Sequence, residues 1–209
     1  MYNKFFKRFL DIVLSFCGIV VLAIPMLILA LLIKIDSKGP VFFKQKRVGL
    51  HKKHFNILKF RSMRTDTPKD MPTHMLGDAS SHITKVGGIL RKLSLDELPQ
   101  IFNIFAGQMS IIGPRPALWN QDDLIAERDK YGANDIKPGL TGWAQINGRD
   151  ELPIEVKAKL DGEYVEKLSF WFDVKCFFGT ILSVLRSDGV VEGGTGELEK
   201  QKEEEGAAK

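Results

Sequence analysis

The sequence lacks the short motifs that mark several large enzyme classes. It contains no Gly-x-x-x-x-Gly-Lys loop, no Gly-x-Gly-x-x-Gly and no Asp-x-Asp. These motifs bind nucleotide phosphates through glycine-rich turns or hold a divalent cation between two carboxylates. Their absence argues against P-loop hydrolysis, dinucleotide binding and glycosyl transfer of the Asp-x-Asp type.

Cysteine and histidine are scarce, with two and four residues. Cys17 lies in an apolar run and Cys176 in an aromatic one, and neither they nor the histidines have the spacing of a metal site. We therefore expect a reduced, cytosol-facing environment. Acidic residues are missing from residues 38–64, which hold nine Lys and Arg. Because few aromatic residues alternate with these cations, the pattern argues against nucleic-acid binding.

Charge is also absent from residues 12–33, which are 22 consecutive uncharged and mostly apolar residues. This length is enough to cross a bilayer of roughly 30 Å. Lysines and arginines flank both ends, however, and cationic flanks prefer the cytoplasmic side. Pro25 interrupts the run and should break a helix. We expect a re-entrant helix that enters and leaves on one face, with a simple kinked span as the alternative.

The basic segment after this run predicts a small β-hairpin. Residues 41–45 and 54–60 are rich in β-forming side chains and are separated by Gly49 and a basic turn. If the strand alternation continues, Lys59 and Arg61 share one face and could bind a phosphate together. A basic stripe against anionic lipid headgroups is an equal alternative.

An adjacent pair of carboxylates, Asp96 and Glu97, predicts a reactive site. Ser94 with Glu97 three residues later fits a capping box, and Pro99 is tolerated only in a first helical turn. Both carboxylates should therefore lie at a helix N-terminus, where the helix dipole favours anions. An ordinary acidic N-cap is the alternative.

The rest of the chain predicts helices around this site. Helical patterns cover residues 83–92, 118–130, 154–168 and 170–186; the last one is very apolar and suits an interfacial helix or a core helix. The glycine-rich residues 137–149 could cradle a ligand or form a structural loop. The expected fold is α+β, mainly helical with a small hairpin, in a monotopic membrane protein with interfacial amphipathic helices. Residues 1–37 would be the anchor, 38–189 the catalytic domain and 190–209 a flexible acidic tail.

Several motifs together are specific enough to identify a family. They are Phe6-Lys7-Arg8 with Asp11, Lys59-Phe60-Arg61-Ser62-Met63, Arg91 with Leu93-Ser94-Leu95-Asp96-Glu97-Leu98-Pro99-Gln100, Gly107 with Met109-Ser110, Gly113-Pro114-Arg115-Pro116, and Pro138-Gly139-Leu140-Thr141-Gly142-Trp143-Ala144-Gln145. To about Gly189 the chain resembles the bacterial sugar transferases, or monotopic phosphoglycosyl transferases, and most closely their small PglC-like members. It departs from them at Arg47-Val48-Gly49, where many members have Arg-Pro-Gly, and after Asp150.

The resemblance implies transfer of a sugar 1-phosphate from a UDP-sugar to undecaprenyl or another polyprenyl phosphate, with release of UMP. Asp96 would be the nucleophile and Glu97 would assist it, through Mg²⁺ or by proton transfer. Both would hold the Mg²⁺ cofactor. Substrate phosphates would be bound by cations, namely Lys59, Arg61, Arg91, Arg115 and, more weakly, Arg149. The family anchor is a re-entrant helix broken at a proline, which corresponds to Pro25.

The expected location is the cytoplasmic face of the bacterial inner membrane, at the first membrane step of glycoconjugate or polysaccharide assembly. A noncatalytic membrane-surface scaffold that binds anionic lipid or a nucleotide sugar is the main alternative, since the basic stripe would suffice for it. A magnesium-dependent lipid phosphatase is a second. The identity of the sugar, the glycan pathway and the oligomeric state do not follow from the sequence.

Overall fold

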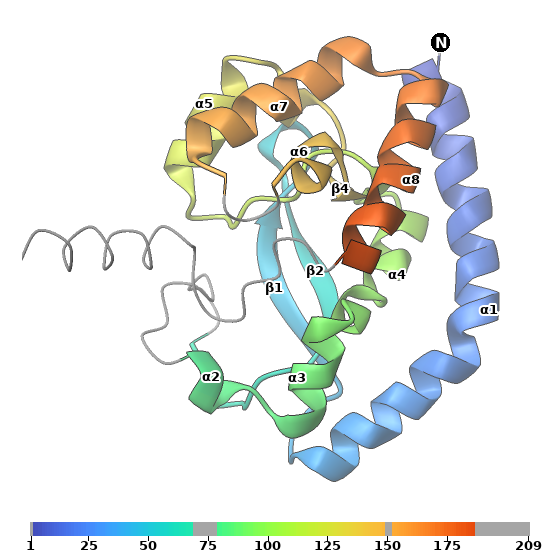
Figure 1. Ribbon diagram of the computed structural model, residues 1–209, viewed down its shortest axis with the longest axis vertical. Helices are drawn as coiled ribbons and strands as arrows, with labels where there is room; N and C mark the ends of the chain where they lie inside the picture. The colour runs from blue at the N-terminus through green and yellow to red at the C-terminus, as the bar shows by residue number, and fades with distance from the viewer. Residues whose placement is uncertain (1, 69–78, 149–151, 187–209) are drawn as a thin grey trace, which may run out of the picture.

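The computed structural model of the chain describes residues 2–68, 79–148 and 152–186. A β-hairpin lies at its centre, with helices on both sides of it and one long helix along its edge (Figure 1). The predicted mainly helical α+β fold is confirmed. In chain order the elements are η1 (Tyr2–Phe6), α1 (Lys7–Asp36), β1 (Phe42–Val48), η2 (Leu50–Lys52), β2 (His54–Phe60), α2 (Ala79–His82), α3 (Lys85–Lys92), η4 (Leu95–Glu97), α4 (Gln100–Phe105), β3 (Ser110–Ile112), α5 (Asp122–Asp129), η5 (Ala133–Asp135), β4 (Gly139–Thr141), α6 (Trp143–Ile146), α7 (Ile154–Lys167) and α8 (Phe170–Arg186).

Helix α1 contains the whole uncharged run and is long and apolar enough to cross a membrane by length and composition. Its ribbon changes direction along its length (Figure 1), and Pro25 is its internal proline. Proline removes one backbone hydrogen bond and its ring clashes with the preceding turn, which explains the bend. Exposed apolar side chains cover most of the surface of this helix, since only 11% of its apolar stretch is buried within the protein.

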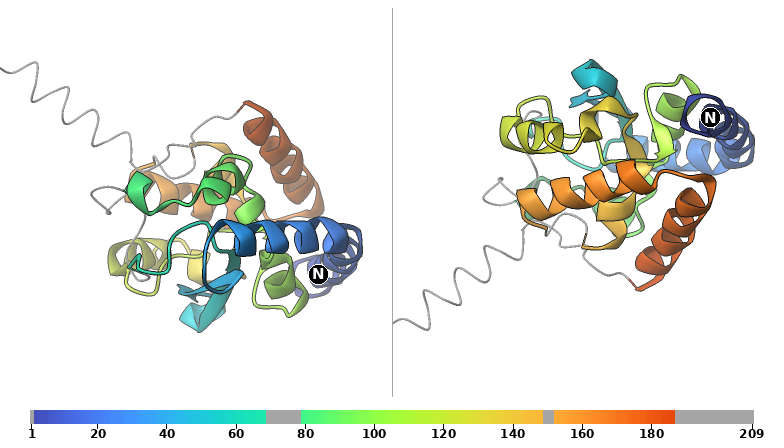
Figure 2. Two further views of the ribbon diagram at one scale, coloured as in Figure 1. Left: turned by 90° about the horizontal axis from the view of Figure 1, so that it is seen from below. Right: turned by 90° about the horizontal axis from the view of Figure 1, so that it is seen from above.

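The N-terminal end of α1 is tied to the rest of the protein by charged side chains. Lys7 Nζ donates to Asp173 Oδ2 of α8 at 2.5 Å, and Arg8 donates to the carbonyls of Ile104 and Phe105 at 2.7 and 2.8 Å. Lys7 and Arg8 are among the cations that flank the apolar run in the sequence, and in the fold they make internal contacts. The start of α8 accordingly lies beside the first turns of α1 (Figure 2).

Asp11 completes this attachment, because its Oδ1 accepts hydrogen bonds from Ser110 Oγ and from the backbone N–H of Ile111, both at 3.0 Å. Asp173 also accepts from two tyrosine hydroxyls, Tyr2 at 2.7 Å and Tyr164 at 2.6 Å. Buried charges are expensive unless they are hydrogen-bonded. This network meets that condition and locks α1 to α8, α7 and β3.

The hairpin predicted from residues 41–45 and 54–60 is confirmed as β1 and β2. The strands pair antiparallel, with Phe42 opposite Phe60 and Phe43 opposite Lys59. Arg61 follows the last residue of β2, and its backbone N–H donates to the carbonyl of Val41 at 2.9 Å. The chain after Pro116 continues the sheet, since Val48 N–H donates to the carbonyl of Ala117 at 2.9 Å.

A second, parallel pair of strands joins β3 to β4, with Ser110 opposite Gly139 and Ile112 opposite Thr141. Sequence patterns do not predict these strands, because each has only three residues. A Cβ on Gly139 would overlap the backbone of Gly113, so this close approach requires glycine. Residues 139–141 are thus part of the fold, which supports the structural alternative for that part of the glycine-rich segment.

The predicted helices are largely confirmed. The last two match α7 and α8 almost residue for residue, and α3 starts two residues later than expected. Helix α5 is shorter than the predicted 118–130, because Leu118 forms a β-bridge with Arg47 instead. A buried ion pair, Arg128 Nη2 to Asp161 Oδ2 at 2.6 Å, fixes α5 against α7. The predicted acidic tail lies outside the described residues.

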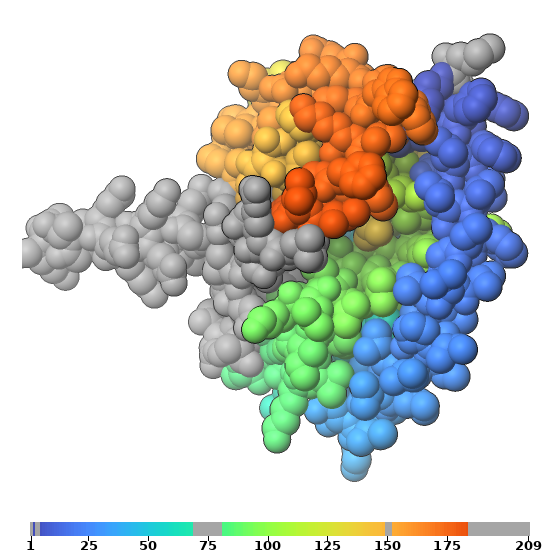
Figure 3. Space-filling model, turned by 45° about the vertical axis from the view of Figure 1, so that its right-hand side comes forward, coloured from blue at the N-terminus to red at the C-terminus, as the bar shows by residue number. Residues whose placement is uncertain are grey.

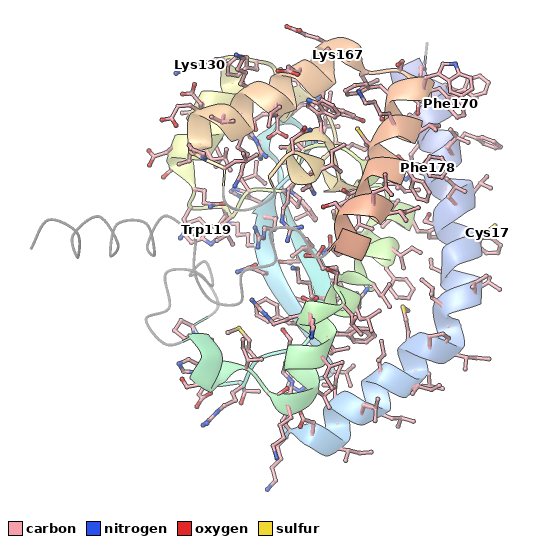
Figure 4. The ribbon with its side chains drawn as sticks, viewed as in Figure 1. Cys17, Trp119, Lys130, Lys167, Phe170 and Phe178 are labelled. Atoms are coloured by element: carbon pink, nitrogen blue, oxygen red, sulfur yellow. The ribbon has the colours of Figure 1, made fainter. Side chains whose placement is uncertain are left out.

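Exposed apolar side chains form a surface over α1, α3, α4 and α8. Helices α1 and α8 lie on one face with the α3–α4 region between them (Figure 3). The labelled Phe170 and Phe178 on α8 and Cys17 on α1 are on the same side of the molecule (Figure 4). We call this set the apolar surface; its members include Phe9, Phe16, Val20, Ile24, Leu27, Leu31, Ile89, Leu93, Phe102, Phe105, Phe170, Trp171, Phe177, Phe178, Ile181 and Leu182.

Candidate active site

The two carboxylates lie in the short turn η4, which runs directly into α4. Leu98 and Pro99, between η4 and α4, both have helical backbone angles. The backbone N–H of Ile101 donates to the carbonyl of Leu98 at 3.1 Å, which continues the helical run. The expected position at a helix start is therefore confirmed.

The predicted capping box is wrong. Ser94 has left-handed backbone angles, φ 54° and ψ 21°, and its side chain makes no capping hydrogen bond. A capping serine needs an extended backbone to aim its oxygen at the N–H groups of the first turn. Glu97, the other half of the expected box, points instead to cations from two other segments.

Glu97 is held by two cations at once. Its Oε1 accepts from Lys59 Nζ and from Arg115 Nη2, each at 2.7 Å, and its Oε2 accepts from Arg115 Nη1 at 3.3 Å. Burial disfavours the charged form of Glu97, but Arg115 and Lys59 outweigh this effect and hold the pKa of Glu97 well below its usual range. Glu97 is therefore ionised and joins β2 to the Pro-Arg-Pro segment.

Asp96 has a different environment although it is the adjacent residue. It is 8% exposed, and its Oδ2 lies 3.9 Å from Lys59 Nζ, beyond hydrogen-bond reach. Within the part of the chain that the structure describes, its carboxylate accepts no hydrogen bond. Burial raises the pKa of Asp96; Lys59 opposes this shift and the neighbouring charge of Glu97 adds to it.

The Pro-Arg-Pro segment places Arg115 by fixing the backbone on both sides of it. The carbonyl of Pro114 accepts from Gly139 N–H at 2.8 Å, and the carbonyl of Pro116 accepts from Arg47 Nη1 at 3.0 Å. Proline also restricts the backbone of the residue before it, here Arg115. The guanidinium is therefore presented to Glu97 by a rigid segment, and the Arg115 side chain stays 34% exposed.

The structure brings four of the predicted site residues together, namely Lys59, Asp96, Glu97 and Arg115. Arg91 is on α3, where its charge partly opposes the rise in the pKa of Asp96 that burial causes, without direct contact. Arg61 does not join them. Its guanidinium donates to the carbonyls of Ser37, Lys38 and Pro40 at 2.7–2.9 Å and so holds the chain that leaves α1. Arg149 lies outside the described residues.

The donor set can accommodate a Mg²⁺ ion with help from a substrate. No cluster of three or more His, Cys, Asp or Glu side chains occurs in residues 2–68, 79–148 and 152–186. Mg²⁺ is commonly bound by one or two carboxylates together with substrate phosphates, however. The free carboxylate of Asp96 fits this requirement, whereas the oxygens of Glu97 are already shared with Lys59 and Arg115.

Comparisons of the sequence with a family profile and with known proteins both identify sugar transferases. A family profile described as bacterial sugar transferase matches residues 2–187. The chain is 39% identical to the uncharacterized sugar transferase EpsL of Bacillus subtilis over 184 residues, which cover 88% of this chain and 89% of that protein.

Two longer relatives have more explicit names. The undecaprenyl-phosphate glucose phosphotransferase of Komagataeibacter xylinus is 41% identical over 84% of this chain and 35% of its own length. The UDP-glucose:undecaprenyl-phosphate glucose-1-phosphate transferase of Escherichia coli is 38% identical over 86% of this chain and 40% of its own length. This chain thus spans nearly all of the first relative and less than half of the other two.

Proposed function

The chain belongs to the bacterial sugar transferase family, and we propose that it transfers a sugar 1-phosphate from a UDP-sugar to undecaprenyl phosphate, releasing UMP, through a covalent intermediate on Asp96. The names of the relatives from Komagataeibacter xylinus and Escherichia coli support this donor and acceptor. The observation that carries the proposal is the contrast between the adjacent carboxylates. Glu97 is neutralised by two cations, while the Asp96 carboxylate accepts no hydrogen bond from the described residues.

The first step uses the free carboxylate as a nucleophile. One Asp96 oxygen attacks the phosphorus that bears the sugar, a new O–P bond forms, and the bond from that phosphorus to the bridging oxygen of the diphosphate breaks. UMP leaves with the bonding electrons. Lys59 lies between both carboxylates and Arg115 remains partly exposed, so these cations can contact the diphosphate oxygens and offset charge repulsion between the anions.

The second step regenerates the carboxylate. An oxygen of undecaprenyl phosphate attacks the same phosphorus, the bond to Asp96 breaks, and undecaprenyl diphosphate sugar is the product. Glu97 keeps Lys59 and Arg115 in place through both steps. Its low pKa means that it remains charged and so favours this electrostatic role over proton transfer.

Mg²⁺ is the proposed cofactor, held by Asp96 with the phosphate oxygens of the donor and with Glu97 nearby. When bound it would supply positive charge that lowers the repulsion between carboxylate and diphosphate. The residues of the chain supply the rest of the site: Asp96 the nucleophile, Lys59 and Arg115 the fixed cations.

The acceptor is a lipid, and the apolar surface supports a membrane location for the site. Turn η4 lies between α3 and α4 in the chain, and both helices contribute exposed apolar side chains to that surface. We propose that α1 enters and leaves the membrane on the cytoplasmic side. Two attachments support this: Asp11 near its start bonds β3, and Asp36 at its end accepts from the backbone N–H of Val86 on α3 at 3.1 Å.

The test is a transfer assay on the full-length protein in lipid nanodiscs. A panel of UDP-sugars is incubated with undecaprenyl phosphate and Mg²⁺, and UMP is measured. We expect UMP release with at least one sugar, and loss of at least about 10³-fold of the rate in Asp96→Asn, because its amide is a poor nucleophile. Asp123→Asn, an exposed acid in the first turn of α5, is the matched control and should retain full activity.

Four outcomes would contradict the proposal. Binding of a UDP-sugar without any turnover would favour the scaffold alternative. Release of inorganic phosphate in place of UMP would favour the phosphatase. Full turnover in Asp96→Asn, or the absence of a labelled phosphosugar on the protein after rapid quenching, would remove Asp96 as the nucleophile.

A further inference from the structure

A buried amide nitrogen close in sequence to the carboxylates makes no hydrogen bond within the described residues. Gln100, the first residue of α4, is 1% exposed, and its Nε2 has no hydrogen-bond partner among the described residues. Leaving such a group unpaired costs free energy comparable to a lost hydrogen bond. An unpaired buried amide in a native structure therefore needs an explanation.

The same helix offers a direct comparison in Asn103, which is 6% exposed. Its Oδ1 accepts from the backbone N–H of Leu58 at 2.9 Å, and its Nδ2 donates to the carbonyl of Asn56 and to Gln108 Oε1 at 2.8 and 2.7 Å. The Asn103 amide, which holds α4 to the hairpin, is therefore fully hydrogen-bonded. The Gln100 nitrogen makes no such bond.

The position of Gln100 in the helical run indicates its partner. Long side chains on a helix lean toward the preceding turn, so Gln100 covers the residues three and four positions before it, Glu97 and Asp96. The Glu97 oxygens already accept from Lys59 and Arg115, whereas the Asp96 carboxylate accepts no hydrogen bond in the described part of the chain. Gln100 is also less exposed than Asp96, at 1% against 8%.

We propose that Gln100 is a positioning residue for Asp96, an inference that rests on the proposed function. When the donor binds, Gln100 Nε2 donates to the inner oxygen of the Asp96 carboxylate and leaves the outer oxygen free to attack phosphorus. In the aspartyl phosphosugar, the inner oxygen becomes the carbonyl oxygen of the acyl phosphate and still accepts this hydrogen bond. The attacking oxygen is thereby selected and its direction fixed.

The test compares Gln100→Met with Asn103→Leu in the full-length protein. Methionine fills a similar volume without an amide. We expect Gln100→Met to lower kcat and the rate of adduct formation about 10- to 100-fold, the range for a hydrogen bond to a charged group. The KM for the UDP-sugar should change less than about threefold, because the lost contact acts on the chemical step. The melting temperature should stay equal or rise, because an unpaired polar group is removed from the interior.

Asn103→Leu should behave in the opposite way: its melting temperature should fall, because the substitution leaves the N–H of Leu58 unpaired. The positioning role is wrong if Gln100→Met keeps activity within about twofold of the wild type. It is also wrong if the melting temperature of Gln100→Met falls together with its activity, as that of Asn103→Leu should. Gln100→Leu repeats the measurement if the methionine variant does not fold. A wild-type protein that forms no adduct would instead refute the proposed function itself, and the two failures are thus distinguishable.

Discussion

Lys7 and Asp173 are 166 residues apart in the chain, yet Lys7 Nζ lies 2.5 Å from Asp173 Oδ2 and both side chains are 9% exposed. This ion pair joins the first turn of the apolar helix to the first turn of the last helix. Hydrogen bonds from Tyr2 and Tyr164 surround it, and burial together with Asp173 raises the pKa of Tyr164 so that it stays a neutral donor.

Removing Lys7 should therefore destabilise the whole protein. Lys7→Met leaves the Asp173 carboxylate buried without its cation, which typically costs about 3–5 kcal/mol. Thermal unfolding in nanodiscs should show a clear drop in the melting temperature. Lys92→Met, an exposed lysine at the end of α3, is the control and should change little. Equal melting temperatures for the two variants would mean that the pair contributes nothing.

Arg61 gives a second stability prediction that separates two roles. Its guanidinium donates to three backbone carbonyls between α1 and β1, so Arg61→Met should lower the melting temperature while the KM for the donor stays near the wild-type value. Arg115→Met should do the reverse, raising KM or lowering kcat with a smaller effect on folding, because Arg115 is partly exposed. A rise in KM for Arg61→Met at unchanged melting temperature would restore the phosphate-binding role predicted from the sequence.

The pH dependence of kcat/KM should report the state of Asp96. Burial raises its pKa, and attack requires the ionised form, so activity should fall as pH decreases through a value above the ordinary aspartate pKa of about 3.9. Glu97 stays ionised over this range. By linkage, the same shift makes the contribution of Asp96 to stability decline as pH rises through its folded-state pKa. An acid limb at or below the ordinary aspartate value would show that burial does not control this carboxylate.

The proposed re-entrant path of α1 can be tested by labelling. Single cysteines placed before residue 9 and after residue 38, in a background with Cys17 replaced, should both react with an impermeant thiol reagent from the cytoplasmic side. Both ends of α1 are bonded to the same folded unit, which is why we expect one-sided access. Labelling of one end from the opposite side would establish a true span.

Much of the architecture follows from local patterns, as residues 54–60 and 170–186 illustrate. Strand alternation in the first segment and helical periodicity in the second predict the same elements that the folded protein contains, β2 and α8. Family membership is likewise confirmed by the profile match to residues 2–187, since the motifs around Asp96 and Arg115 are specific. The roles of individual site residues remain predictions.

Other features depend on contacts between distant residues and could not be read from the sequence. Ser94 was expected to cap a helix, but its left-handed backbone turns its side chain away from that role. In the sequence Lys7 has the pattern of a membrane flank, because its partner Asp173 lies at the other end of the chain. Strands of three residues, such as β3, are too short for any periodic signal.

The bonds of Asp11 bear on attempts to produce a water-soluble version of the enzyme. Deletion of residues 1–37 would remove Asp11, which accepts hydrogen bonds from Ser110 Oγ and Ile111 N–H. It would also remove Lys7, the cation that pairs with Asp173. The remaining protein would then contain exposed β3 backbone and an orphaned acid. Replacing exposed apolar side chains of α1, such as Val20 and Ile24, with polar ones keeps these bonds and is the better engineering route.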